Sequence, residues 1–174
     1  SSGPAWEMAR ALSKSEQHGW ARFVAMQNHY NLIYREEERE MNPLCVAEGV
    51  GLIPWSPLAR GLLARPRPAD STIAGGGTER AKLDAYSPQL YDSASDWDVV
   101  SAVESVAKNR GVSMAEVALA WLLQRPGVTA PIIGATKMPH LETALKALDL
   151  TLSADEAKAL EAPYKPHGVR GYVV

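Results

Sequence analysis

Hydrophobic positions fall into short blocks that alternate between helical spacing and compact apolar runs. At the start of the chain, apolar residues recur near helical spacing at Ala5, Met8 and Leu12. Pro4 suits the first turn of such a helix, because the N–H group that proline lacks is unpaired there in any case. Residues 22–27 then form a short, mostly apolar run that is typical of a strand covered on both faces. A helix followed by a buried strand is therefore predicted.

The same alternation continues along the chain. The predicted elements are a helix at 35–48, a strand at 52–55, helices at 97–109 and 114–124, a short buried strand at 130–134, and helices at 139–148 and 153–161. Serine followed three residues later by an acidic residue indicates helix starts at Ser95, Ser113 and Ser153. Repeated β-then-α order predicts an α/β fold with a parallel sheet and right-handed crossovers. About three strands are visible, fewer than a closed barrel or an open doubly wound sheet requires.

Residues 56–95 lose this periodicity. They contain four prolines and the triplet Gly75-Gly76-Gly77. Long connections without regular structure are uncommon in compact domains and are usually lids, binding loops or disordered segments. We favour a lid over about residues 59–95. The glycine triplet lacks the spacing of a phosphate-binding loop and has no lysine and hydroxyl pair after it, so flexibility is the preferred interpretation.

Composition indicates an ordinary soluble chain with one domain, residues 1–174. The sequence has 46% hydrophobic residues, 22% charged residues and a formal net charge of −2. This balance implies neither a nucleic-acid nor a membrane partner, and no apolar run approaches the roughly 20 residues of a membrane span. The single cysteine, Cys45, is expected to be a buried hydrophobe in a reducing, cytoplasmic compartment. The chain starts at Ser1 without methionine and enters a helix at once, so we expect a portion of a longer protein.

Polar and aromatic residues stand where the predicted strands end and loops begin. They form the groups Gln27-Asn28, Trp55-Ser56-Pro57 and Gly134-Ala135-Thr136-Lys137. In (β/α) barrels, the C-terminal ends of the strands build the active site. An amide, an aromatic ring and a turn with a lysine are suited to hold a cofactor that carries an aromatic ring and phosphates. Judged singly, Gln27 also fits a structural amide, Trp55 a core residue and Lys137 a solvated charge.

Three blocks resemble the aldo-keto reductase family in order and spacing. They are residues 27–32 (QNHYNL), residues 54–63 (PWSPLARGLL) and residues 131–137 (PIIGATK) followed by His140 and Leu141. Residues 1–6 are similar to the end of that family's fifth strand, so the resemblance covers essentially the whole chain. It implies an α/β fold of the (β/α)8 TIM-barrel type, of which this chain is the C-terminal portion.

The resemblance also implies an NADP(H) site. Ser1, Ser2 and Gln27 match positions that hold the nicotinamide carboxamide, and Trp55 matches the aromatic residue that stacks on the nicotinamide ring. The loop that surrounds the pyrophosphate is matched by Ser56, Pro57, Leu58, Arg60, Gly61 and Leu62. The segment around the adenosine 2′-phosphate is matched by Gly134, Ala135, Thr136, Lys137 and His140, although the family often has arginine or glutamine at the last position.

The family's catalytic tetrad is an aspartate, a tyrosine, a lysine and a histidine, and it has no counterpart in these residues. The resemblance therefore implies that the parent protein is an NADPH-dependent oxidoreductase that reduces small aldehydes or ketones, and that this chain alone is inactive. A nucleotide-sensing regulatory protein of the same fold, like those associated with channels, is an alternative. A non-catalytic half-barrel is another, and its open strand edges predict self-association or pairing with a completing N-terminal half.

The remaining ionisable residues suggest no further chemistry. No cysteine and histidine spacing resembles a metal site. The carboxylates of Glu36, Glu37, Glu38 and Glu40 are interpreted as the solvated face of a helix, and His18 and His167 as surface or hydrogen-bonded histidines.

Overall fold

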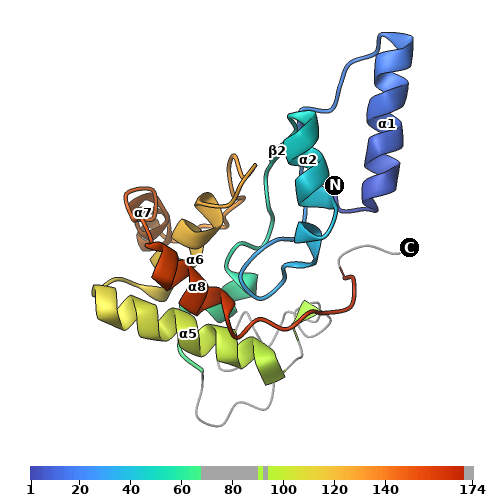
Figure 1. Ribbon diagram of the computed structural model, residues 1–174. Coiled ribbons are helices and arrows are strands. Elements are labelled where there is room, and N and C mark those ends of the chain that lie inside the picture. The colour runs from blue at the N-terminus through green and yellow to red at the C-terminus, as the bar shows by residue number, and fades with distance from the viewer. Residues whose placement is uncertain (68–89, 92–93, 171–174) are drawn as a thin grey trace.

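The computed structural model describes residues 1–67, 90–91 and 94–170 (Figure 1). Its α-helices are α1 (Ala5–His18), α2 (Met41–Glu48), α5 (Ala94–Arg110), α6 (Met114–Leu123), α7 (Met138–Lys146) and α8 (Ala154–Glu161). Two short 3-10 helices are η1 (Glu36–Glu38) and η2 (Ala59–Ala64), and the strands are β1 (Ala25–Met26) and β2 (Gly51–Leu52). The fold is therefore α/β, with helices that far outweigh a small sheet.

The sheet is parallel, as predicted. Ala25 pairs with Gly51 and Met26 with Leu52. The predicted third strand does not form a regular strand, but residues 127–132 run beside β2 in the same direction. The Thr129 N–H donates to the Leu52 carbonyl at 2.8 Å, and the Ile132 N–H donates to the Pro54 carbonyl at 2.8 Å. The segment beside β2 thus has the predicted order and direction, but it is not a regular strand. β1 and β2 are shorter than the predicted strands at 22–27 and 52–55.

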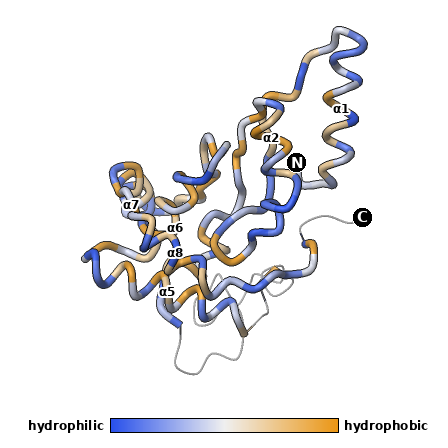
Figure 2. Tube along the Cα trace, in the orientation of Figure 1, coloured by the Kyte–Doolittle hydropathy of each residue, from blue (hydrophilic) through white to orange (hydrophobic). Residues whose placement is uncertain are grey.

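The helices form two groups on either side of these strands (Figure 1). One group packs α1 and α2 on β1 and β2 around Met8, Leu12, Cys45 and Leu52. The hydropathy in Figure 2 alternates along α1, consistent with its single buried face. Cys45 is fully buried, as predicted, and burial raises the pKa of its thiol to about 11.

The second group holds the larger core, between η2, α5, α6 and α8. Its largest buried side chains include Tyr30, Leu63, Trp121, Leu122 and Leu160. Val128 packs against both cores, so the segment beside β2 joins the two groups. Among the described residues, no helix is both long enough and apolar enough to cross a membrane.

Helix starts were predicted with mixed success. Ser113 and Ser153 each accept a hydrogen bond from the backbone N–H three residues later, and Glu116 and Glu156 return one, so both capping boxes are confirmed. α5 begins at Ala94, so a helix starts at Ser95 to within one residue as predicted, with Ser95 inside the first turn. The predicted helix at 35–48 is divided into η1 and α2, because Glu40 between them adopts φ −142°.

The predicted lid lies largely outside the described residues. Within the range 59–95, residues 68–89 and 92–93 are outside the part of the chain that the structure describes. At the start of that range, η2 covers Ala59–Ala64 with a kink at Arg60 and Gly61, and it buries Ala59, Leu62 and Leu63 in the larger core.

The acidic cluster is only partly solvated, so the expectation of a solvated helix face is wrong for Glu36 and Glu37, while Glu40 is exposed. Glu36 and Glu37 are only 8% and 5% exposed. Burial raises the pKa of Glu36, but hydrogen bonds from the Tyr164 hydroxyl, the His167 N–H and Arg39 outweigh it and hold that pKa below its ordinary value. The cluster is a structural network in which residues 34–38 meet the C-terminal segment.

Several contacts in this network join residues far apart in sequence. Arg35 lies 3.2 Å from Glu161, the Tyr164 hydroxyl donates to Glu36 at 2.6 Å, and the Arg170 N–H donates to the Tyr34 hydroxyl at 2.9 Å. The His167 side chain is not on the surface. It is 5% exposed, and its Nε2 lies 3.2 Å from the Asp96 carboxylate. We call these contacts the C-terminal clamp.

Glu37 makes stability depend on pH. Burial raises its pKa to about 7, and a hydrogen bond from the Asn28 amide only partly opposes the shift. A carboxyl whose pKa is higher in the folded chain stabilises the fold at low pH, and that contribution is lost as pH rises through about 7. Between roughly pH 5.5 and 7.5, we expect the wild-type chain to lose about 2 kcal/mol of its free energy of unfolding through Glu37, and Glu37→Gln not to show this loss. Urea unfolding at both pH values measures the difference. A variant with the wild-type pH dependence contradicts this assignment.

The predicted strand at 22–27 is not covered on both faces. Phe23 is 52% exposed and Val24 79% exposed, whereas Met26 is buried. Ile132 and Ile133 in the segment beside β2 are also exposed, at 41% and 37%, so the expected burial of residues 130–134 is wrong as well. Both segments would need a further layer of structure to cover their apolar side chains.

We expect the 174-residue chain to associate through these uncovered strands, because exposed apolar strand edges pair readily. Sedimentation velocity over a range of concentrations measures the association, and Phe23→Lys with Val24→Lys should shift the distribution toward monomer. A wild-type chain that stays monodisperse and monomeric at all concentrations contradicts this prediction.

Candidate functional site

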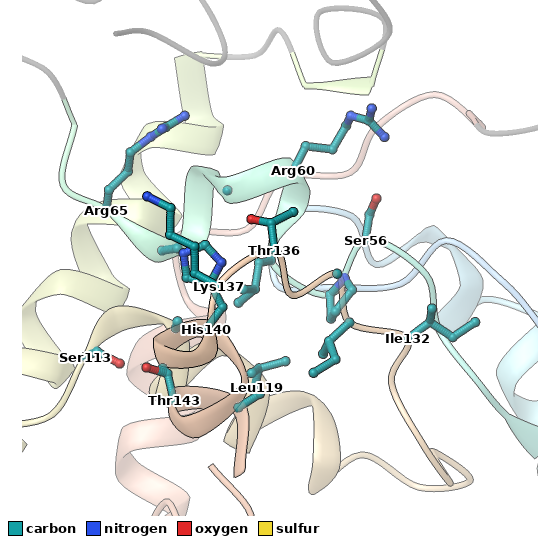
Figure 3. Close-up of a pocket in the computed structure, with 18 residues that line it drawn as sticks. Ser56, Arg60, Arg65, Ser113, Leu119, Ile132, Thr136, Lys137, His140 and Thr143 are labelled. Carbon is teal, nitrogen blue, oxygen red and sulfur yellow. The ribbon is translucent and has the colours of Figure 1, made fainter. Parts of the chain in front are cut away.

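A cavity of about 880 Å³ opens between η2 and the start of α7 (Figure 3). Its size lies within the range of small-molecule and cofactor sites. The described residues that line it are Ser56, Pro57, Leu58, Arg60, Gly61, Ala64, Arg65, Ser113, Ala115, Leu119, Ile132, Ile133, Gly134, Thr136, Lys137, His140, Thr143 and Ala144. The cavity thus brings together residues 56–65, residues 113–119 and residues 132–144, three segments that are far apart in sequence.

The backbone of the first segment is unusual. Ser56, Ala59 and Arg60 have φ of 51°, 47° and 56°, and Gly61 has φ of 101°. Left-handed backbone is uncommon for residues other than glycine and is concentrated at active sites and ligand clamps. The Asn31 amide helps to hold this turn, since its Nδ2 donates to the Ser56 carbonyl at 2.9 Å. The left-handed backbone of these non-glycine residues costs conformational energy, and such strain is typical of a binding loop.

The cavity is basic. Arg60, Arg65, Lys137 and His140 all line it, and none of its described lining residues is acidic. Figure 3 places Lys137 and His140 together on one side, close to Arg65, with Ser56 and Ile132 on the opposite side. Fixed positive charge in a concave site attracts anionic ligands such as phosphates.

The second segment begins a helix. Lys137 is the N-cap of α7, and Pro139 lies in the first turn. The first N–H groups of a helix and its dipole favour a negative charge. Lys137 therefore combines a charged side chain with a helix terminus at the same edge of the cavity.

Nine of the fifteen predicted site residues line the cavity. They are Ser56, Pro57, Leu58, Arg60, Gly61, Gly134, Thr136, Lys137 and His140. Ala135 is exposed and is not in the lining. The Leu62 side chain is buried in the larger core, where it is 3% exposed, so only the backbone of Leu62 could make the predicted pyrophosphate contact. The other four predicted residues are Ser1, Ser2, Gln27 and Trp55.

Two of those four are joined directly. The indole Nε1 of Trp55 donates to the Ser2 hydroxyl at 3.2 Å. Trp55 follows β2, its side chain is half-buried, and its backbone N–H donates to the Asn28 carbonyl at 2.9 Å. Gln27 is exposed just after β1. The structure thus brings Trp55 and Ser2 together, and none of these four residues is in the cavity lining.

Sequence reasoning missed several residues of the site. Arg65 adds a cation to the cavity, and Ser113, Ala115 and Leu119 form a wall from the start of α6. Thr143 and Ala144 complete it from α7, one turn after His140. The helical spacing of His140, Thr143 and Ala144 was a usable signal for a shared face, whereas no local pattern indicated that α6 would close the cavity.

Behind Trp55 lies a buried aromatic group that sequence reasoning also missed. His29 is fully buried, and its ring stacks on those of Tyr34 and Trp55, with both pairs of centroids 4.2 Å apart. Burial, followed by the positive charges of His167, Arg170 and Arg60, lowers the pKa of His29 to about 3. The imidazole is therefore neutral at physiological pH and cannot supply a proton from a charged ring.

Within the part of the chain that the structure describes, no group of three histidine, cysteine, aspartate or glutamate side chains is placed to hold a metal ion. The cavity instead presents Arg60, Arg65 and Lys137, with no acidic side chain among its described lining residues.

Comparison with known proteins decides the family. The model of the Aldo/keto reductase family matches residues 1–165. The chain belongs to the aldo-keto reductase family. An inferred aryl-alcohol dehydrogenase of Schizosaccharomyces pombe is 48% identical over 97% of this chain and 46% of its own length. An aldo-keto reductase of Fusarium vanettenii is 46% identical over 96% of this chain and 44% of its own length.

A third relative is named by a defined reaction. The versiconal hemiacetal acetate reductase of Aspergillus parasiticus is 41% identical over 97% of this chain and 48% of its own length. The chain thus spans about half the length of the curated aldo-keto reductases it matches. The matched region includes every residue of the cavity and of the aromatic group behind Trp55.

Proposed function

We propose that this chain is the cofactor-binding, C-terminal portion of a (β/α)8 barrel in an NADP(H)-dependent oxidoreductase. The observation that carries the proposal is the basic cavity with its left-handed loop, which joins Arg60, Arg65 and Lys137 around one concave surface. Its cations and strained backbone suit the phosphates of a dinucleotide. The exposed apolar residues Phe23, Val24, Ile132 and Ile133 are consistent with a barrel that further strands complete.

The substrate class follows from the relatives. Their names include an aryl-alcohol dehydrogenase and a hemiacetal acetate reductase. We infer that the whole protein interconverts small aldehydes or ketones and the corresponding alcohols in the cytoplasm. NADPH, when bound, supplies the hydride for carbonyl reduction. The fully buried Cys45 fits a reducing compartment.

Different residues of the chain would bind different parts of the dinucleotide. Arg60, Arg65 and Lys137 would neutralise phosphate charges, and the backbone from Ser56 to Gly61 would follow the pyrophosphate. Trp55 would support the nicotinamide from one face, because a flat indole favours offset stacking.

We infer that none of the described residues takes the part of the family's general acid. His29 is neutral and buried, and the Tyr34 hydroxyl is bound to the backbone of Arg170. Carbonyl reduction without a proton donor is slow. We infer that the tetrad is supplied by the barrel's other half and that the 174-residue chain alone does not reduce carbonyl compounds.

The proposal is tested by titrating the chain with NADPH and following tryptophan fluorescence. Trp55→Ala is expected to weaken NADPH binding about threefold to tenfold, the range of a lost aromatic pair. Trp20→Ala is the control, since Trp20 is 62% exposed and lies outside the cavity. The proposal is wrong if the folded wild-type chain does not bind NADPH, or if both variants bind it equally well.

A further inference from the structure

Three aromatic rings form a continuous stack at the end of β1. Tyr34 and His29 have centroids 4.2 Å apart and planes inclined by 10°, and His29 and Trp55 have centroids 4.2 Å apart and planes inclined by 12°. Tyr34 and His29 are buried, whereas Trp55 is half-buried. Since His29 covers one face of the indole, the accessible part of Trp55 lies away from the stack.

The middle ring of the stack is held by hydrogen bonds at its edge. His29 Nε2 lies 2.6 Å from the Tyr91 hydroxyl and 3.4 Å from Asn31 Nδ2. The Asn31 amide also donates to the Tyr91 hydroxyl at 3.0 Å. The two protons of this amide are directed to the Ser56 carbonyl, at 2.9 Å, and to the Tyr91 hydroxyl, which therefore accepts from Asn31. The hydroxyl proton of Tyr91 is then directed to Nε2, which acts as the acceptor. This assignment agrees with a neutral imidazole.

Asn31 is itself fixed on its other side. Its Oδ1 accepts from the N–H groups of Ile33 at 2.9 Å and of Tyr34 at 3.0 Å. Its Nδ2 reaches the carbonyl of Ser56, the residue after Trp55. A single buried amide therefore ties the histidine edge to the backbone turn that carries the tryptophan.

Trp55 is restrained from several directions at once. Its backbone pairs with that of His29 as an isolated parallel bridge, and its indole N–H donates to the Ser2 hydroxyl at 3.2 Å. The imidazole closes the buried face of the ring. A side chain locked by packing and hydrogen bonds pays little entropy when a ligand stacks on it.

We propose that His29, held by Tyr91 and Asn31, is a positioning residue that fixes the Trp55 indole in the plane on which a nicotinamide ring stacks. This inference rests on the proposed NADP(H) function. It assigns His29 no contact with the cofactor and no proton transfer. Its role is to set the orientation of the indole surface that Trp55 offers to the nicotinamide end of the ligand.

The test compares two ligands on the 174-residue chain. NADPH carries the nicotinamide ring, and 2′-phosphoadenosine 5′-diphosphoribose carries the same phosphates without it. Tyr91→Phe removes the hydroxyl that holds His29, and His29→Leu removes both the ring and the hydrogen bond. We expect each variant to weaken NADPH binding about threefold to tenfold, the range of an aromatic pair, and to leave the affinity for the second ligand unchanged.

Tyr30→Phe is the matched control. Tyr30 is a buried tyrosine of the same segment whose hydroxyl makes one hydrogen bond of 2.6 Å, to Glu38, and whose ring contacts Trp121 rather than Trp55. We expect this variant to bind both ligands like wild type. If His29→Leu does not fold, His29→Phe and Tyr91→Phe decide the question. Both keep a flat ring in the core and remove the hydrogen bond between His29 and Tyr91, so both are expected to weaken NADPH binding alone.

The outcomes separate the two proposals. A wild-type chain that binds neither ligand overturns the NADP(H) function and this inference with it. A wild-type chain that binds both ligands supports the function. In that case, His29 and Tyr91 variants that weaken both ligands equally, or neither, overturn the positioning role alone.

Discussion

Replacing Lys137 with alanine lowers the affinity of the chain for NADPH by about 10-fold to 100-fold and leaves the affinity for NADH nearly unchanged. This is the expected result if Lys137, at the start of α7 and in the lining of the basic cavity, meets the 2′-phosphate. A hydrogen bond to a charged group contributes about 1.5–3 kcal/mol, and each 1.4 kcal/mol is a factor of ten. NADH lacks that phosphate, so its binding has little to lose.

Lys146→Ala is the control for Lys137→Ala. Lys146 lies in the last turn of the same helix and outside the cavity lining, so it tests whether any loss of positive charge from α7 has the same effect. Fluorescence titrations with both nucleotides at two salt concentrations measure the difference. An equal loss of NADPH affinity in both variants, or a parallel loss for NADH in Lys137→Ala, contradicts a specific phosphate contact.

Trp121→Ala destabilises the chain by about 3–5 kcal/mol, the largest effect on folding that we expect from a single substitution. Trp121 is completely buried in the larger core. Its indole N–H donates to Glu161 at 2.9 Å, and Arg35 and Arg125 lie 5.5 and 5.0 Å from the centre of its ring. The substitution leaves a cavity and removes a donor from a carboxylate that joins α6 to α8.

The control for this prediction is Trp6→Ala. Trp6 is 57% exposed on α1, so its loss should change the free energy of unfolding by about 0.5 kcal/mol or less. Urea unfolding followed by far-ultraviolet circular dichroism compares the two variants. If both have the unfolding midpoint of wild type, Trp121 does not anchor the core.

Local signals in the sequence predicted local structure well. Ser113 and Ser153 begin helices as capping boxes because the serine and the glutamate three residues later satisfy each other's neighbouring N–H groups without help from elsewhere. The order of the parallel segments also followed from the sequence. Their length and burial did not, since Phe23, Val24 and Ile132 are apolar yet exposed.

Long-range polar contacts were beyond the reach of pattern reading. Glu36 and Glu37 have the composition of a solvated face, but Tyr164, His167 and Asn28 come from other parts of the chain to satisfy them. Burial of a charged residue depends on such partners, and spacing within one segment does not reveal them.

The same limit applied to the site. Gly61 and Lys137 were predicted from motifs that lie within single loops, and both line the cavity. His29 and Tyr91 are 62 residues apart, and their 2.6 Å contact exists only in the folded chain. His29 lies inside the block at residues 27–32, but the block does not reveal that its ring meets Trp55 and Tyr91, so the positioning group behind Trp55 emerged only from the structure.

The C-terminal clamp has a consequence for the order of events during synthesis. Its hydrogen bonds span 126 residues between Arg35 and Glu161 and 136 residues between Tyr34 and Arg170. Contacts at such separation form late, because the intervening chain must first be ordered. A ribosome must therefore release nearly the whole segment before Arg35 and Glu36 find their partners. Until then, the side chains of Arg35 and Glu36 remain in water, and only contacts between closer residues, such as those of β1 with β2, hold the nascent chain.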